Sequence, residues 1–240
     1  MTNRNLKLPL ISVVLTVLLS GGCNLTIQTP ESPAATLTSA PEATPSPAGP
    51  QNFAQLPEGC PPQCSKLSLI GVNLEGVDLE GADLTGANLS RANLAGINLA
   101  RTNLAGANLN RVNLSGSNMS EAFLPGANLS EANLFEANLD GVNLEEADLE
   151  EANLGGADLR ETNLRETNLG SADLPGANLS FADLGGANLL GANLSRADLT
   201  WADLSRVDLT GADLTGASYN NATTWPDDFD PEQGGARLVE

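Results

Sequence analysis

The chemistry open to this sequence is limited by its side chains, which include three cysteines and no histidine. Cys60 and Cys64 lie close together in the segment Gly-Cys-Pro-Pro-Gln-Cys. Outside the cytoplasm, two neighbouring thiols most often form a disulfide, and the intervening residues allow a small loop. A redox pair or half of a metal site is the alternative, but no histidine or further nearby cysteine supplies more ligands. We therefore expect a Cys60–Cys64 disulfide and no metal site.

The third cysteine, Cys23, follows an apolar stretch near the start of the chain. Residues 8–19 are almost wholly apolar and are preceded by basic residues, whereas residues 20–22 are small. Such a stretch is too short for a transmembrane helix, which needs about 20 residues, but it matches the apolar region of a signal peptide. The pattern resembles the lipobox of bacterial lipoproteins, in which a leucine and two small residues precede the cysteine.

The lipoprotein resemblance implies that residues 1–22 are a signal peptide and that Cys23 receives a lipid. The mature protein would then be anchored to a membrane through Cys23, on the periplasmic or cell-surface side. One departure concerns the position three residues before the cysteine, which holds Ser20, with Leu19 one residue earlier. Secretion of a soluble periplasmic or extracellular protein, after cleavage near Gly22, is therefore the alternative.

Residues 23–56 are rich in proline, threonine, serine and alanine and have no periodic apolar pattern. This composition favours an extended, unpacked chain. We expect a disordered tether that links the lipid anchor to a folded domain. Residues 57–66, which contain the Cys60–Cys64 pair, are expected to form an N-terminal cap on that domain.

A five-residue unit recurs from residue 67 to residue 217. Leucine occupies every fifth position from Leu69 to Leu214, with Met119 as the only replacement. The residue two positions earlier is small or β-branched, and the residue just before the leucine is nearly always Asn or Asp, with Phe123 as the clear exception. An α-helix would scatter these leucines around its axis, because five residues advance it by about 500°. In an extended chain residues two apart share a face, so each unit must contain one turn.

The unit Ala-(Asn/Asp)-Leu-x-x resembles the signature of the pentapeptide-repeat family. The resemblance implies an all-β fold, a right-handed quadrilateral β-helix over residues 67–218 with four repeats per coil. The thirty leucine-centred units would make about seven to eight coils, spaced about 4.8 Å apart. Leucines and small residues would fill the interior, and the Asn and Asp side chains would bond to nearby backbone groups.

Three large aromatic residues, Tyr219, Trp225 and Phe229, are concentrated in residues 219–240. This tail resembles the closing segment of many bacterial pentapeptide-repeat proteins. We expect it to form a C-terminal cap, because the last coil of a β-helix otherwise exposes an unpaired edge. Dimers that join cap to cap occur in the family, so a homodimer through the C-terminal end is one partner hypothesis.

With four units per coil, residues twenty apart stack on one side. Two ion pairs are expected on this basis, Arg111 with Glu131 and Arg101 with Glu121. Exposed pairs of this kind stabilise little. Two clusters of acidic residues are expected to lie on the solvated surface. The first is a band of glutamates, and the second is a set of aspartates that point in different directions around one coil and so form no calcium site. They are Glu145, Glu146, Glu150 and Glu151, and Asp198, Asp203, Asp208 and Asp213.

Phe181 and Trp201 are also twenty residues apart and would stack on one side. Two exposed aromatic residues on a polar rod indicate a contact patch for a protein partner that the sequence does not identify.

Catalysis has little support, because the chain has no histidine, no plausible nucleophile–base pair and no nucleotide-binding motif. We therefore expect no enzyme and no cofactor. A net charge of −19 disfavours direct binding of nucleic acid. The first hypothesis is an envelope-anchored scaffold or protein-interaction module. The alternative comes from acidic family members that mimic duplex DNA and bind topoisomerases such as gyrase, although export would separate this chain from gyrase.

Overall fold

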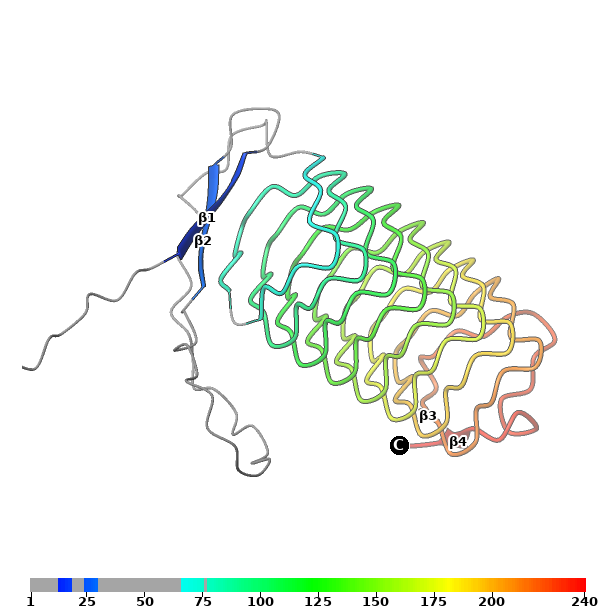
Figure 1. The fold of residues 1–240 in the computed structure, drawn as a ribbon. Helices are drawn as coiled ribbons and strands as arrows, with labels where there is room; N and C mark the ends of the chain where they lie inside the picture. Colours follow the sequence, from blue (N-terminus) through cyan, green and yellow to red (C-terminus); the bar gives the residue numbers. More distant parts are fainter. Residues whose placement is uncertain (1–12, 19–23, 30–65, 76) are drawn as a thin grey trace, which may run out of the picture. The chain divides into compact units, whose positions relative to one another are not determined.

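The computed structural model describes residues 13–18, 24–29, 66–75 and 77–240 (Figure 1). The chain divides into two compact units, residues 1–54 and residues 55–240. Cys23, Cys60 and Cys64 lie outside the described residues. The lipid anchor and the disulfide therefore stay predictions.

The first unit contains a pair of antiparallel strands, β1 (Val13–Leu18) and β2 (Asn24–Thr29). Val13 pairs with Thr29, and Leu18 pairs with Asn24. Valine, isoleucine and threonine dominate these segments, and β-branched residues favour extended backbone. The sequence predicted an extended, unpacked tether from residue 23, whereas in the structure residues 24–29 pair with residues 13–18 of the apolar stretch. Cleavage before Cys23 would remove β1 and leave β2 without this partner.

The second unit is a coil of five-residue units over most of its length. Backbone pairing joins residues twenty apart, such as Asn93 and Asn113, and each of these pairings between coils is parallel. Leu94 donates its N–H to the carbonyl of Asn113 at 2.7 Å, and Asn113 donates its own N–H to the carbonyl of Ala92 at 2.9 Å. A register of twenty residues requires four units per coil. The right-handed quadrilateral β-helix implied by the family resemblance is confirmed.

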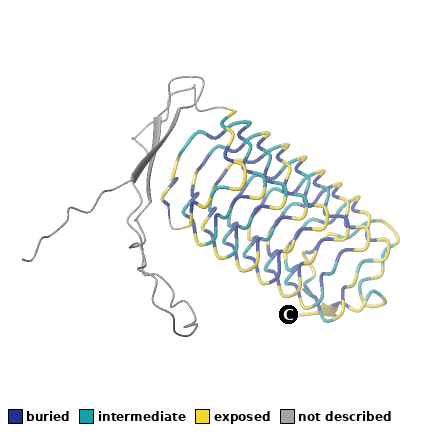
Figure 2. Cartoon of the chain, in the orientation of Figure 1, coloured by how far each residue is buried: buried dark blue, intermediate teal, exposed yellow. Residues whose placement is uncertain are grey.

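One large and one small side chain from each unit fill the interior. Along every coil of the ribbon, buried positions alternate with intermediate and exposed ones (Figure 2). Leu134 is 0% exposed and Ala132, two residues earlier, is 1% exposed. Both point inward because residues two apart in extended backbone share a face. Met119 is as fully buried as the leucines that it replaces. The predicted core is therefore the core of the structure.

Each corner of the coil is a tight turn with a left-handed residue at its third position. In one such turn, Ala92 donates its N–H to the carbonyl of Leu89 at 3.0 Å, and Arg91 has a φ of 58°. A positive φ at this position is typical of a type II turn, where glycine is favoured because it has no Cβ. Arginine, glutamate and aromatic residues also occupy it here. The sequence predicted a turn in every unit but not this backbone conformation.

Threonine replaces the small interior residue in some units, and its hydroxyl then donates a hydrogen bond to a backbone carbonyl of the preceding coil. Thr102 donates through Oγ1 to the carbonyl of Leu79 in the preceding coil at 2.8 Å, and Thr162 and Thr167 make the equivalent bonds. Ser117 occupies the same kind of position and is 1% exposed. Its Oγ has no hydrogen-bond partner among the described residues. A buried hydroxyl left unpaired costs about 1–3 kcal/mol.

We expect Ser117→Ala to raise the free energy of unfolding by about 1 kcal/mol, because it removes the unpaired hydroxyl and keeps a small side chain. Thr102→Val is the matched control. It keeps the shape but loses the bond to Leu79, and should lower the free energy of unfolding by about 1 kcal/mol. Urea denaturation followed by circular dichroism measures both. An unchanged midpoint for Ser117→Ala would mean that the hydroxyl has a partner in solution.

The last coil is extended by two short pairings with the tail. Strand β3 (Ser218–Tyr219) pairs in parallel with β4 (Arg237–Leu238), and Thr224 pairs with Asp203. The tail between them returns across the end of the coil, where a Cβ on Gly234 would lie 3.1 Å from the Phe229 ring and 3.2 Å from Leu214. The tail therefore packs against Leu214, the last leucine of the repeat.

The three aromatic residues of the tail form a cluster in which Trp225 contacts the other two. The Tyr219 and Trp225 rings meet edge to face with centroids 5.5 Å apart, and the Trp225 and Phe229 rings stack at 5.3 Å. Tyr219 is buried. Ring pairs with these spacings contribute beyond the area that they bury. The structure thus brings together the three residues assigned to the C-terminal cap.

Tyr219 offers a direct probe of this cap, because the chain contains one tyrosine. Burial raises the pKa of its phenol above the ordinary value for tyrosine, and the nearby Glu232 and Asp230 add to the effect. An unfolded chain loses this proton at lower pH than the native chain does, so stability should fall as pH rises above about 10, the ordinary pKa of tyrosine. Titration of the absorbance at 295 nm should give a higher midpoint in buffer than in denaturant. Coincident midpoints would mean an exposed phenol.

Candidate protein-interaction surface

The outer sides of the rod are lined by ladders of asparagine side chains. Asn133 donates through Nδ2 to Oδ1 of Asn113 at 3.0 Å, and Asn113 donates in the same way to Asn93 at 2.9 Å. The Oδ1 of each asparagine also accepts the backbone N–H two residues later, as between Ser115 and Asn113 at 3.3 Å. The predicted bonding of these amides to nearby backbone is confirmed. Their hydrogen bonds stay within the rod, so their role is structural.

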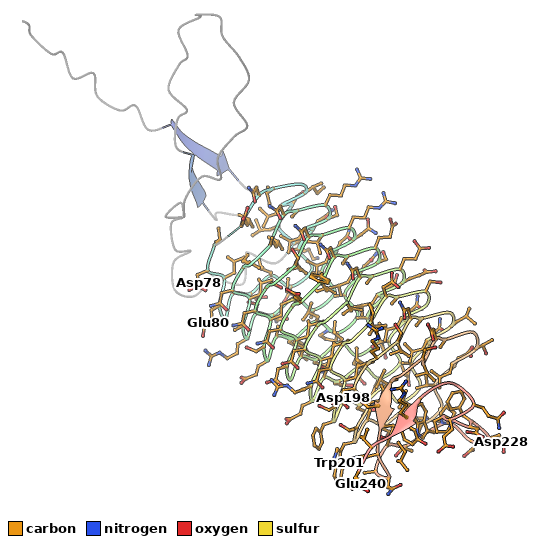
Figure 3. The ribbon with its side chains drawn as sticks, turned by 90° about the horizontal axis from the view of Figure 1, so that it is seen from below. Asp78, Glu80, Asp198, Trp201, Asp228 and Glu240 are labelled. Atoms are coloured by element: carbon orange, nitrogen blue, oxygen red, sulfur yellow. The ribbon has the colours of Figure 1, made fainter. Side chains whose placement is uncertain are left out.

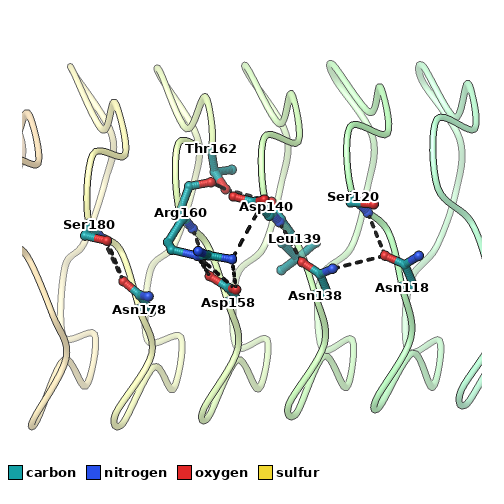
Figure 4. A network of polar contacts seen from close by, with 10 residues as sticks. All are labelled: Asn118, Ser120, Asn138, Leu139, Asp140, Asp158, Arg160, Thr162, Asn178 and Ser180. Atoms are coloured by element: carbon teal, nitrogen blue, oxygen red, sulfur yellow. Dashed lines mark hydrogen bonds and ion pairs between the residues drawn. The ribbon is translucent and has the colours of Figure 1, made fainter.

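Aspartate interrupts these ladders, because a carboxylate cannot donate. Asn138 donates to Asn118 at 3.1 Å, but the ladder has Asp158 as its next member (Figure 4). Arg160 binds this carboxylate, with Nη2 2.7 Å from Oδ2, and lies 3.8 Å from Asp140. The hydrogen bond to Asp158 is the main cause of a raised pKa for Arg160. The arginine therefore offsets the charge where the ladder breaks.

Of the two expected ion pairs, one is present in the structure and the other is replaced by a different pair. Arg111 forms a bidentate pair with Glu131, with both N···O distances at 2.8 Å, and this bond lowers the pKa of Glu131. The pairing of Arg101 with Glu121 was wrong, since Arg101 binds Glu80 instead. Glu80 lies 21 residues earlier, so the long arginine reaches it diagonally across one coil. Both pairs are exposed to solvent and contribute little to stability.

The acidic residues are distributed over several sides of the rod. The glutamate band occupies two consecutive units and hence two neighbouring sides. Asp198, Asp203, Asp208 and Asp213 follow one another around the last coil on its four sides. Among residues 13–18, 24–29, 66–75 and 77–240, no group of acidic or cysteine side chains could hold a metal ion. These positions form solvated surface.

A hollow of about 340 Å³ lies on one side near the C-terminal end. Its polar lining includes Ser195, Arg196, Asp213 and Thr215. The Asp213 carboxylate accepts the Thr215 N–H at 2.9 Å, and its bonds to Thr215 lower its pKa. A lowered pKa makes this carboxylate a weaker base, which disfavours a role as a general base toward either hydroxyl.

Phe181 and Trp201 form an aromatic pair at one corner of the rod. Their rings stack with centroids 5.6 Å apart and an interplanar angle of 10°. Each residue is 55% exposed, and Trp201 projects outward near the C-terminal end (Figure 3). Both have left-handed backbone, with φ of 62° and 64°, which is unusual for bulky residues. The twenty-residue register thus places the two residues side by side, as the sequence predicted.

Three other large apolar residues in the middle of the rod are exposed singly. Phe123 is 46% exposed, Phe135 is 44% exposed and Leu190 is 48% exposed, each on a different side of the rod. The sequence reasoning noted Phe123 only as an exception to the repeat and missed the other two. A search of the outward positions for large apolar residues would have found them. The aromatic pair differs from all three because its members touch.

A family model for pentapeptide repeats matches eight copies in the chain, from residue 63 to residue 222. The chain belongs to the pentapeptide-repeat family. A comparison with curated proteins found no match. In the described parts of this pentapeptide-repeat protein, no helix is long and apolar enough to span a membrane.

Solved pentapeptide-repeat structures are similar to the chain. HetL of the cyanobacterium Nostoc sp. strain PCC 7120, involved in the regulation of heterocyst differentiation, is 33% identical over 72% of this chain and 83% of its own, with a TM-score of 0.37. QnrB1, a plasmid-mediated fluoroquinolone resistance protein, is 22% identical over 73% of this chain and 91% of its own, with a TM-score of 0.56. A protein of the Arabidopsis thaliana thylakoid lumen is 33% identical over 44% of this chain and 67% of its own, with a TM-score of 0.25.

Proposed function

We propose that this pentapeptide-repeat protein is a non-enzymatic scaffold, anchored to a membrane through Cys23, that binds a partner protein with the aromatic pair. The stacked, exposed rings of Phe181 and Trp201 carry this proposal. Interfaces draw much of their binding energy from a few aromatic anchors. The pair also lowers the stability of the fold, because bulky residues at a left-handed position strain the backbone.

The rest of the rod supports a passive role. The leucines, the small residues and the asparagine ladders are all explained by packing and by hydrogen bonds within the rod. Where a hydroxyl does meet a carboxylate, as Thr85 donates to Asp83 at 2.6 Å, the two residues belong to one unit and the bond stays within the rod. The acidic surface disfavours direct contact with nucleic acid. The proposal therefore includes no cofactor and no reaction.

The double variant Phe181→Gly, Trp201→Gly tests the role of the aromatic pair. Glycine relieves the left-handed backbone, so the variant should stay folded. We expect co-purification of a specific partner from the protein's own cells to fall at least about tenfold, as for loss of an interface anchor. Phe123→Asn removes a single exposed ring from another side and is the matched control. If the double glycine variant and Phe123→Asn recover equal amounts of the partner, the aromatic pair is not the binding site.

Cell fractionation tests the anchor and the cellular location. The wild-type protein should be recovered with the membrane, and Cys23→Ala should release it or block its processing, because a lipidated cysteine is its only proposed anchor. A soluble periplasmic or extracellular pool of the wild type would favour plain secretion. A soluble cytoplasmic pool would instead favour the alternative function, an acidic DNA mimic that binds a topoisomerase such as gyrase.

A further inference from the structure

The last coil leaves part of its backbone edge uncovered by the tail. We define the open edge as residues 206–214. Within it, the N–H groups of Arg206, Leu209, Gly211 and Leu214 and the carbonyls of Val207 and Ala212 have no hydrogen-bond partner among the described residues. Ordered backbone groups in proteins are nearly always paired. A row of unpaired N–H and C=O groups is therefore a template for another strand.

The preceding coil shows what this edge would normally bind. One coil earlier, Leu189 donates its N–H to the carbonyl of Asp208 at 2.9 Å, and Gly191 donates to the carbonyl of Thr210 at 2.9 Å. The carbonyl of Ala187 accepts the N–H of Asp208 at 3.2 Å. Every group of the open edge thus has an equivalent that is paired one coil earlier. The open edge has the geometry to receive one more parallel strand.

The other sides of the last coil are already closed by the tail. Thr224 takes the position that a further coil would occupy. Leu204 donates its N–H to the carbonyl of Thr224 at 2.8 Å, and Thr224 donates its own N–H to the carbonyl of Ala202 at 3.0 Å. Strand β4 does the same beside β3, and Gly216 donates to the carbonyl of Gly235 at 2.8 Å. Between these two closures, Asp208, Thr210 and Gly211 are exposed. The gap in the cap therefore coincides with residues 208–211 of the open edge, whereas Leu214 is buried beneath Gly234.

The charge around the open edge limits what could bind there. All four ladder positions of the last coil are aspartates, and the tail adds further acidic residues. In the ladders, each later side chain donates to the side chain one coil earlier, as Asn188 donates to Asn168 at 2.9 Å. Asp208 can only accept, and its bonds to Thr210 keep its pKa low. A strand beside Asp208 must bring a hydrogen-bond donor, preferably a cationic one.

We propose that the open edge binds an extended, lysine-rich segment of a partner protein, which adds to the rod as a parallel strand. A lysine of this segment faces Asp208, and its backbone bonds to Val207 and Leu209. Small apolar residues on either side of that lysine point toward the interior. This inference rests on the proposed function in one respect, that the partner is a protein. It names a second surface, separate from the aromatic pair.

A synthetic peptide of alternating valine and lysine, with blocked ends, is the probe, and the full chain is the receptor. We expect its binding to shift the amide signals of Leu209 and Gly211 and to slow their hydrogen exchange by about tenfold or more at saturation. The amides of Leu189 and Gly191 are already paired and should not change. A peptide with glutamate in place of lysine should not bind.

Backbone methylation of the probe separates strand addition from attraction between charges. In the proposed pairing, the lysine nitrogens face the rod and the valine nitrogens face away, because alternate residues of a strand bond to opposite sides. Methyl groups on the lysine nitrogens should abolish binding, whereas methyl groups on the valine nitrogens should preserve it. Asp208→Asn should weaken binding by about three- to tenfold without changing this contrast.

Equal binding of the two methylated peptides would overturn the proposal, because it would show binding by charge alone. A second result would also overturn it. If the Leu209 amide exchanges slowly without peptide, and both this protection and the measured molar mass increase with protein concentration, a second copy of the chain covers the edge. Neither result would affect the proposed function, which depends on the glycine variants at the aromatic pair. Retention of the partner by those variants would reject that function and leave the peptide result intact.

Discussion

Leu134→Ala is expected to lower the free energy of unfolding by about 3 kcal/mol, within the range for buried leucines. Leu134 is fully buried, and its neighbours in the same interior column are Leu114 and Leu154. The coils above and below are held by backbone hydrogen bonds, so they cannot close in on the space that the missing atoms leave. The cost should therefore include a cavity as well as the lost burial.

The matched control is Leu209→Ala, at the end of the rod. Leu209 is 8% exposed and has a leucine neighbour in its column on one side only, Leu189. Its loss should cost about 1.5 kcal/mol, because the open end can relax around the smaller side chain. Urea denaturation followed by circular dichroism compares the two variants. Equal losses would contradict the view that stacking on both sides makes the central leucines more costly to remove.

Gly126→Val is expected to destabilise the protein by about 2 kcal/mol through backbone strain. Gly126 is a corner residue with a φ of 61°, and a Cβ built there meets nothing within 4 Å. The effect is therefore one of conformation and not of a clash with a neighbouring coil. A β-branched residue is among the least tolerated at this φ.

Two further corner variants distinguish strain from packing. Gly126→Asn should cost less than about 1 kcal/mol, because asparagine tolerates left-handed backbone. Glu136 has a φ of 54°, so Glu136→Gly should stabilise the protein by about 0.5 kcal/mol after the added flexibility of the unfolded chain is counted. Thermal unfolding ranks the variants. A valine variant as stable as the asparagine variant would show that the corners tolerate any side chain.

The fold could be read from the sequence because packing repeats in every unit. A leucine at every fifth position and a small residue two places earlier fix which side chains point inward. The number of units per coil came from the family resemblance, since the period of five is compatible with other coils. The positive φ at Arg91 and Glu136 could not be predicted, because neither residue type favours that conformation.

The surface was predicted less completely than the core. The register of twenty residues placed Phe181 beside Trp201, but it could not show that Arg101 turns toward Glu80. Long side chains reach diagonally across coils, and sequence spacing alone does not rank those contacts. The open edge could not be predicted either, since it depends on the path that residues 225–236 take across the end of the rod.

The unbroken register has a consequence for how such a rod can change over generations. Insertion of one coil, twenty residues, would lengthen the rod by about 4.8 Å and keep every later side chain on its present side. Insertion of a single unit would move all later residues to the next side. Between Phe181 and Trp201, such an insertion would separate the two rings while leaving the interior intact. Duplication of five-residue units can therefore rearrange the surface of this protein with little change in its stability.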